Sequence, residues 1–344
     1  MRPRDLVGVL KAAYHAKQTT MLWGGPGVGK SSLVREVTDS LNITLLDRRI
    51  SQMESVDLRG LPVPDLHAQL TMWLESEDLP NVKRDGEHGV LLLDEINHAP
   101  KSIRAACFQL ILDRRVGKYR LPDGWVAWAA GNRAKDRALT EQLETPLKNR
   151  FMHLTLEVHN EDWIHWALKR GLTPQVISFI RQFPTMLNEF EELVNGPAER
   201  RRSLDDMNAF ATPRSWEFLD RMYRQGGFEG QQMEVFSGIV GDNAAIKFTA
   251  HLTMHDKLPN LDHCIQDPEK APVPTDPVVL YALATSLAAR TTPQNLKQVL
   301  TYIGRIKDAE YQVLTVKDAA IRHKEIMDTD AFNEWAARNR HVLL

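Results

Sequence analysis

A glycine-rich segment near the N-terminus has the residue types and spacing of a phosphate-binding loop. Residues 24–31 read Gly-Gly-Pro-Gly-Val-Gly-Lys-Ser and match the pattern G-x-x-x-x-G-K-[ST] at every position. Glycines allow successive backbone N–H groups to point at phosphate oxygens, and a following helix adds its positive N-terminal end. Lys30 can then reach the β- and γ-phosphates of a nucleoside triphosphate, and the Ser31 hydroxyl can bind Mg²⁺. The segment predicts a Walker A loop for ATP and Mg²⁺, with contacts from Gly25, Pro26, Gly27, Val28, Gly29, Lys30, Ser31 and Ser32.

Two carboxylates follow an apolar run further along the chain. Residues 90–93 are Val-Leu-Leu-Leu, and Asp94 and Glu95 come directly after them. A strand that is buried on both faces delivers Asp94 to its carboxyl end, where the carboxylate can hold Mg²⁺ and its hydration shell. Glu95 can polarise an attacking water as a general base. Acidic residues often follow strands, so it is the position downstream of the Walker A loop that favours a Walker B segment.

Three further polar residues are candidates for the same chemistry. Asn132 follows the apolar run 126–130 and can orient the attacking water, although a turn-forming Gly-Asn is the alternative. Arg150 can stabilise a γ-phosphate that is bound to a neighbouring subunit, whereas taken alone it reads as a surface arginine. Arg214 lies in the first turn of a predicted helix, where an ordinary surface charge is the alternative.

The elements that must position these residues alternate between strands and helices. Strands are predicted at 19–23, 43–46, 90–93, 126–130 and 152–156, and helices at 4–17, 31–41 and 103–112. This alternation predicts an α/β fold with a doubly wound, parallel, five-stranded sheet. Ligands of such sheets bind at the carboxyl ends of the strands, which is where the candidate residues lie.

Helical periodicity dominates after residue 158. Four helix starts are predicted where a capping side chain precedes a proline, at Thr173-Pro174, Thr212-Pro213, Asp276-Pro277 and Thr292-Pro293. Residues 258–274 contain four prolines and are expected to form a linker or surface excursion between two helical units. We therefore predict a nucleotide-binding domain at 1–158, a helical lid at 159–256 and a helical C-terminal extension at 257–344.

Composition excludes several classes of protein. The 344 residues carry a net charge of −2, which does not call for a polyanionic partner, although three consecutive arginines at 200–202 leave a local basic patch open. The two cysteines are far apart and favour a reducing cytoplasm, and the twelve histidines form no metal-binding pattern with them. The N-terminus lacks a signal peptide pattern, and the most apolar stretch, 277–289, falls short of the about 20 residues that span a bilayer. We expect a cytoplasmic protein without a membrane segment.

The order and spacing of these motifs over residues 1–225 resemble the MoxR-like branch of AAA+ ATPases. The similarity is greatest to bacterial and phage members that work with von Willebrand factor A domain proteins. It rests on the Walker A loop, Asp94-Glu95-Ile96-Asn97, Asn132, Arg150-Phe151 and Thr212-Pro213-Arg214. The resemblance implies that Asn132 is sensor 1, Arg150 a trans-acting arginine finger and Arg214 sensor 2.

The resemblance also implies a homo-oligomeric ring, usually a hexamer, with ATP between subunits. Such proteins insert a β-hairpin near helix 2, here within residues 56–73, and a second hairpin before sensor 1, here 116–125 with its turn at 122–124. Met72 and Trp73 of the first hairpin either grip a polypeptide or pack against the chain. Asn149 stands where the family often has an acidic residue, and residues 257–344 match no family element.

Three functions are compatible with these features. A ring ATPase could act as a chaperone-like remodeller or activator of a protein partner, such as a von Willebrand factor A domain protein. The alternatives are a nucleic-acid-associated motor or loader, and a slow nucleotide-dependent switch or scaffold. The near-neutral charge and the lack of a helix-turn-helix or zinc motif favour the first, without excluding nucleic acid.

Overall fold

The computed structural model describes residues 1–67, 69–133, 149–195 and 207–339. The chain separates into two compact units. The first comprises Met1–His159 with Glu191–Arg201, and the second comprises Asn160–Phe190 with Arg202–Leu344. The division into a nucleotide-binding domain, a lid and an extension at residues 158 and 256 stays a prediction.

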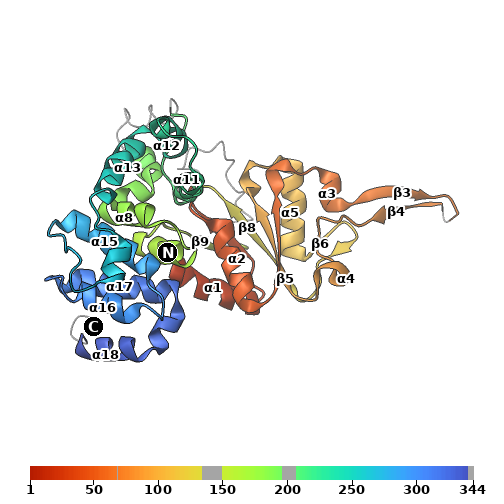
Figure 1. The fold of residues 1–344 in the computed structure, drawn as a ribbon. Helices are drawn as coiled ribbons and strands as arrows, with labels where there is room; N and C mark the ends of the chain where they lie inside the picture. The colour runs from red at the N-terminus through yellow and green to blue at the C-terminus, as the bar shows by residue number, and fades with distance from the viewer. Residues whose placement is uncertain (68, 134–148, 196–206, 340–344) are drawn as a thin grey trace. The chain divides into compact units, whose positions relative to one another are not determined.

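The first unit is built on a parallel sheet of five strands in the order β2-β5-β8-β1-β9 (Figure 1). The strands are β1 (Thr20–Trp23), β2 (Thr44–Arg49), β5 (Gly89–Asp94), β8 (Trp125–Gly131) and β9 (Met152–Thr155). All of β8 is buried, and so is β5 up to Asp94. Continuous apolar runs suit strands that are covered on both faces. The predicted five-stranded, doubly wound α/β fold is confirmed.

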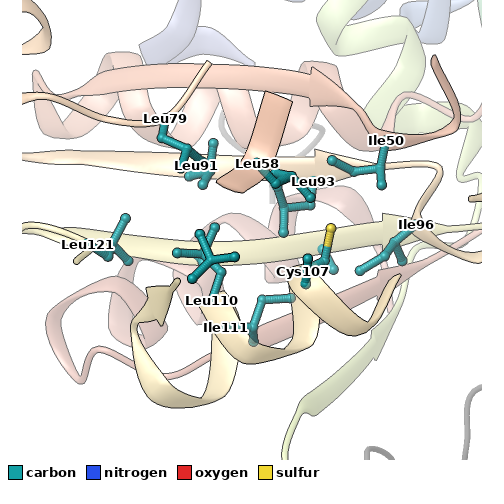
Figure 2. Close-up of a cluster of buried hydrophobic side chains, with 14 of the residues drawn as sticks. Ile50, Leu58, Leu79, Leu91, Leu93, Ile96, Cys107, Leu110, Ile111 and Leu121 are labelled. Atoms are coloured by element: carbon teal, nitrogen blue, oxygen red, sulfur yellow. The ribbon is translucent and has the colours of Figure 1, made fainter. Parts of the chain in front are cut away.

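Successive side chains of β5 point to opposite faces of the sheet. Val90 and Leu92 join a core cluster with α1 (Pro3–His15) and α2 (Lys30–Leu41). Leu91 and Leu93 join a second cluster, with α3 (Ser55–Arg59) and α5 (Lys101–Asp113) on the other face (Figure 2). Because the alternation has a period of two residues, Asp94 falls on the face of α2, next to the Walker A loop.

Two antiparallel hairpins form separate two-stranded sheets outside the five-stranded sheet. The first pairs β3 (Leu61–Asp65) with β4 (Leu70–Leu74), and the second pairs β6 (Arg115–Val116) with β7 (Tyr119–Arg120). The predicted turn of the second hairpin at residues 122–124 is wrong, because the chain reverses at Gly117, which has a φ of 57°. Residues 122–124 instead connect β7 to β8, and Arg114 holds them by donating to Pro122 O at 2.8 Å.

Short helical elements complete the first unit. They are η1 (Ile50–Gln52), α4 (Val82–Asp85) and η2 (Ile96–His98). The helix α9 (Glu189–Asn195) is divided between the units: Glu189 and Phe190 belong to the second unit, and the rest of the helix belongs to the first. Both η1 and η2 come directly after a strand, β2 and β5, and they contact each other at the carboxyl edge of the sheet.

The described part of the second unit contains helices and no strand. The helices are α7 (Asn160–Lys169), α8 (Pro174–Gln182), η4 (Pro184–Leu187), α11 (Pro213–Gln225), α12 (Gln232–Val240), α13 (Asp242–His255), α14 (Leu261–Gln266), α15 (Pro277–Arg290), α16 (Leu296–Ile303), α17 (Ala309–Arg322), η5 (Lys324–Asp328) and α18 (Asp330–Arg338). Phe179, Trp216 and Phe248 are fully buried and stack edge-on or tilted against one another. Helical periodicity after residue 158 therefore reflects a helical core.

Three of the four predicted helix starts are present. Thr212 and Asp276 cap α11 and α15 through their side-chain oxygens. At α8 the Thr173 hydroxyl instead donates to Asp220 at 2.7 Å. The start at Thr292-Pro293 is wrong: the Asn295 side chain closes a turn by accepting from Thr292 N at 2.8 Å, and α16 begins only at Leu296.

The proline-containing segment 258–274 is not a linker or surface excursion. It contains α14, and Cys264 and Ala271 within it are fully buried. Its backbone is tied to α16, because the Tyr302 hydroxyl donates to Pro272 O at 2.7 Å. Small buried residues and accepting carbonyls fix this segment in the core, which its four prolines do not reveal.

The described residues contain neither a candidate membrane span nor a candidate metal cluster. None of their helices is long and apolar enough to cross a membrane. They also hold no cluster of three or more His, Cys, Asp and Glu side chains placed for a metal ion. Cys107 and Cys264 are buried free thiols. The arginines at 200–202 lie outside the described residues.

Candidate nucleotide site

The Walker A loop connects β1 to α2. Gly27 and Gly29 have φ values of 70° and 95°, in the left-handed region that glycine adopts without a steric penalty. Gly24 N donates to Gly131 O at 3.3 Å, which joins the start of the loop to the end of β8. The loop therefore lies at the carboxyl edge of the sheet, and Lys30 is the first residue of α2.

Lys30 brings the loop and Asn132 together. Its Nζ donates to Gly24 O at 2.9 Å, to Gly25 O at 3.0 Å and to Asn132 Oδ1 at 2.9 Å. The side chain is buried, and three acceptors match the three donors of an ammonium group. These contacts hold the positive charge at the loop, where phosphate oxygens would bind.

Ser31 and Asp94 form the second contact between the two motifs. Ser31 Oγ donates to Asp94 Oδ2 at 2.8 Å, and Asp94 Oδ1 accepts from Glu95 N at 2.8 Å. Hydroxyl and carboxylate oxygens are the ligands that Mg²⁺ prefers in proteins. The residues present therefore fit a magnesium ion, and Ser31 and Asp94 are the ones that would hold it.

A second carboxylate, that of Asp47, interacts with Asp94. Burial raises the pKa of Asp47 on the neighbouring strand β2, and the charge of Asp94 raises it further. Arg35 and Arg49 oppose this shift. A divalent cation at Asp94 would relieve the repulsion between the two carboxylates, so the electrostatics of the edge also suit a metal–phosphate ligand.

Glu95 stands in a strained position directly after β5. Its φ of 56° is uncommon for a residue other than glycine, and such backbone strain is characteristic of functional sites. Ser51 Oγ in η1 donates to Glu95 Oε2 at 2.5 Å. Ser51 has no role in the sequence prediction, because its relation to Glu95 depends on β2 lying next to β5.

Asn97 is a second residue that the sequence prediction left without a role. Its Nδ2 donates to Asn132 O at 2.7 Å, so it joins the turn after β5 to the turn after β8. The side chain is 3% exposed. In the sequence, Asn97 is distinguished only as the last residue of the motif Asp94-Glu95-Ile96-Asn97.

The two predicted arginines are not among these contacts. Arg150 is exposed, and its carbonyl accepts from Thr19 Oγ1 at 2.9 Å, just before β1 begins. It therefore lies at the amino edge of the sheet, roughly 16 Å from Gly24 along the strand direction. Arg214 is exposed in the first turn of α11, in the second unit.

A comparison with known families gives this arrangement a context. Residues 19–151 match the family model of an AAA domain of the dynein-related subfamily. This AAA domain is a nucleotide-binding domain, and it includes the Walker A loop, Asp94, Glu95, Asn132 and Arg150. The match does not reach the second unit.

Similar proteins were also found by sequence and by structure. Midasin of Giardia intestinalis is 27% identical over 179 residues, which cover 49% of this chain and only 4% of midasin. The RuvB Holliday junction branch migration motor of Thermotoga maritima is 18% identical, with a TM-score of 0.38 over 88% of this chain and 86% of RuvB. NtrX of Brucella abortus, in complex with ADP, is 13% identical, with a TM-score of 0.36 over 74% of this chain and 67% of NtrX.

Proposed function

We propose that this chain is an AAA+ ATPase that hydrolyses ATP in order to remodel or activate a protein partner. The observation that carries the proposal is the set of hydrogen bonds that joins Lys30 to Asn132 and Ser31 to Asp94, within an AAA domain. A glycine-rich turn without a function would not require these four side chains to meet at one edge of the sheet.

The chemistry follows from the positions of the side chains. The N–H groups of the loop and Lys30 bind the phosphates, and Ser31 and Asp94 hold Mg²⁺, which when bound neutralises charge on the phosphate oxygens. Glu95 accepts the proton of the attacking water, while Ser51 keeps its carboxylate in place. The Asn132 carboxamide orients that water.

The site is completed by a neighbouring copy of the chain. Arg150 is exposed at the amino edge of the sheet and is too far along the strands to reach a phosphate on its own Walker A loop. We therefore assign it to the γ-phosphate of the next subunit, in a homo-oligomeric ring that we take to be a hexamer. We assign Arg214 to the sensor 2 role.

The hairpin formed by β3 and β4 supports a protein client. Met72 and Trp73 are 48% and 40% exposed, so they do not pack into the core. Leu61, Leu66, Leu70 and Leu74 are exposed as well. Asp65 is the only charged residue of the two strands, so this surface suits an apolar polypeptide and not a polyanion. A von Willebrand factor A domain protein is the client that we propose, in the cytoplasm.

The experiment that tests this function captures the client during ATP binding. Glu95→Gln should bind Mg²⁺ and ATP without hydrolysis and should retain a protein partner, identified by mass spectrometry. The matched control is the double variant Glu95→Gln with Lys30→Ala, which should bind neither ATP nor the partner. A wild-type chain that releases no phosphate from ATP, or equal capture by the control, would contradict the proposal.

A further inference from the structure

Asn97 occupies a position that the stability of the fold does not explain. It lies in η2, and only its Nδ2 end can donate to Asn132 O, which fixes the orientation of its carboxamide. Its Oδ1 is then buried without a hydrogen-bond donor among the described residues. Leaving a buried acceptor unpaired is unfavourable, so the Oδ1 end of Asn97 does not stabilise the fold.

Gly131 is the partner that leaves space for this carboxamide. A Cβ atom at Gly131 would lie 2.5 Å from Asn97 Oδ1 and 2.9 Å from the end of the Met21 side chain. Gly131 is not among the described glycines with a positive φ, so its backbone conformation does not require glycine. What requires glycine at this position is the close approach of Asn97, together with that of the flexible end of Met21.

Asn97 thereby joins two residues of the candidate site. It lies two residues after Glu95, and its donor holds the carbonyl of Asn132. The Asn132 carboxamide accepts from Lys30 through Oδ1, since an ammonium group can only donate, and this leaves Nδ2 of Asn132 as a donor towards the reacting groups.

We propose that Asn97 is a positioning residue for ATP hydrolysis, which acts by holding Asn132 in register with Glu95. The inference rests on the proposed function, because it concerns turnover at this site. Asn97 touches neither phosphate nor water, so its effect passes through Asn132. Nucleotide binding, which relies on the loop and Lys30, does not depend on it.

The kinetic test compares Asn97→Asp with Asn132→Ala and with the double variant. Asn97→Asp keeps the shape of the side chain but replaces the donor by an acceptor. It should lower kcat by about 10- to 100-fold, a loss of the kind seen for residues that orient a catalytic group, with KM for ATP nearly unchanged. The double variant should be no slower than Asn132→Ala alone, because both changes remove the same orientation. A double variant whose loss of kcat equals the product of the two single losses would overturn the inference.

A matched control separates positioning from folding. Thr38 is fully buried in the same AAA domain, and its hydroxyl donates to Arg35 O at 2.9 Å on α2. Thr38→Val removes a buried hydrogen bond far from Asn132, so it should change stability but leave kcat unchanged. Equal kcat losses in Thr38→Val and Asn97→Asp would show that the effect of Asn97 is structural.

A second variant tests the contact with Gly131. Gly131→Ala should displace the Asn97 carboxamide and reduce kcat as Asn97→Asp does. Adding Asn97→Ala to Gly131→Ala removes the clash with the carboxamide and leaves only the contact with the flexible end of Met21, so the pair should be no slower than Asn97→Ala alone. A pair that is slower than each single variant would contradict the proposed contact.

The outcomes also separate this inference from the proposed function. A wild-type chain without turnover would count against the proposed function, whereas equal turnover of the wild type and Asn97→Asp would count against Asn97 alone. A crystal structure gives a reading that is independent of turnover. In Asn97→Asp the Asn132 carboxamide should leave Lys30 Nζ, and its retention at the present 2.9 Å would overturn the inference.

Discussion

Ser51 and Glu95 come from the ends of two neighbouring strands and meet through a hydrogen bond of 2.5 Å. Ser51 belongs to the short helix after β2, and Glu95 is the residue after β5. The parallel pairing of β2 with β5 brings these two ends together at the carboxyl edge of the sheet. The carboxylate that we propose as the general base is therefore held by a second element and not by its own strand alone.

Removal of this hydrogen bond should slow hydrolysis without weakening nucleotide binding. In Ser51→Ala the Glu95 side chain gains access to other rotamers, so kcat should fall by about tenfold, which is only part of the roughly 10²- to 10⁴-fold that a positioned base contributes. Ser51→Thr keeps a hydroxyl and serves as the matched control, with kcat close to that of the wild type. Phosphate release and ATP affinity measured on the same samples check this, and a Ser51→Ala variant with normal turnover would show that the contact does not matter for catalysis.

Mixed rings should test whether Arg150 acts on a neighbouring subunit. Lys30→Ala and Arg150→Ala should each be inactive alone, because every site then lacks either the Lys30 ammonium or the Arg150 guanidinium. Mixed subunits create some interfaces that pair an intact Lys30 with an intact Arg150, and these should recover ATP turnover. Mixing should be confirmed by mass spectrometry of the assembled complex. Confirmed mixed rings without any recovery would remove Arg150 from the site.

The hairpin should affect client binding and not basal hydrolysis. In the Glu95→Gln background, Met72→Ala with Trp73→Ala should abolish capture of the protein partner, because the exposed apolar surface then lacks the two side chains proposed to grip the polypeptide. Ile246 on α13 is 57% exposed in the second unit, so Ile246→Ala is a matched control for the loss of an exposed apolar side chain. Capture that survives the hairpin change, or that fails equally in the control, would contradict the role of the hairpin.

The sheet and the Walker A loop were predictable because their signals are local. The glycines of residues 24–31 and the apolar runs of β5 and β8 each determine a conformation within a few residues. The order of the strands is not local, and Ser51 and Asn97 acquire their partners only through that order. A hydroxyl residue shortly after the second predicted strand was the only available sign of Ser51.

The wrong sequence predictions, the helix start at Thr292-Pro293 and the linker at 258–274, also have a physical origin. A threonine before a proline predicts a helix start, but at Thr292 the chain forms only a turn, which Asn295 closes by accepting from Thr292 N, and regular helix begins at Leu296. Segment 258–274 contains four prolines, which predict a linker because proline usually interrupts helices. Its carbonyls instead accept hydrogen bonds from Tyr302 and Arg305, which compensates for the missing regular structure.

Stability of the second unit should fall as the solution becomes acidic. His251 and His255 lie on α13 and both bring Nε2 to Ser178 Oγ on α8, at 2.9 Å and 3.1 Å. Burial lowers the pKa of each to about 4, and for His251 the neighbouring His255 adds to the effect. An unfolded histidine titrates near pH 6.5, so the unfolded chain takes up protons first as the pH falls.

The sign and the size of the effect follow from these values. The free energy of unfolding keeps its full value above about pH 6.5. It falls progressively between about pH 6.5 and about pH 4, because protons then bind the two histidines of the unfolded chain and not those of the folded chain. At pH 5 the loss from His251 should be on the order of 2 kcal/mol in the free energy of unfolding, measured by urea denaturation at pH 7 and pH 5. His251→Gln should flatten this dependence, whereas His263→Gln, an exposed histidine on α14, should leave it unchanged. Equal pH dependence in the wild type and His251→Gln would rule out the buried pair as the acid-sensitive element.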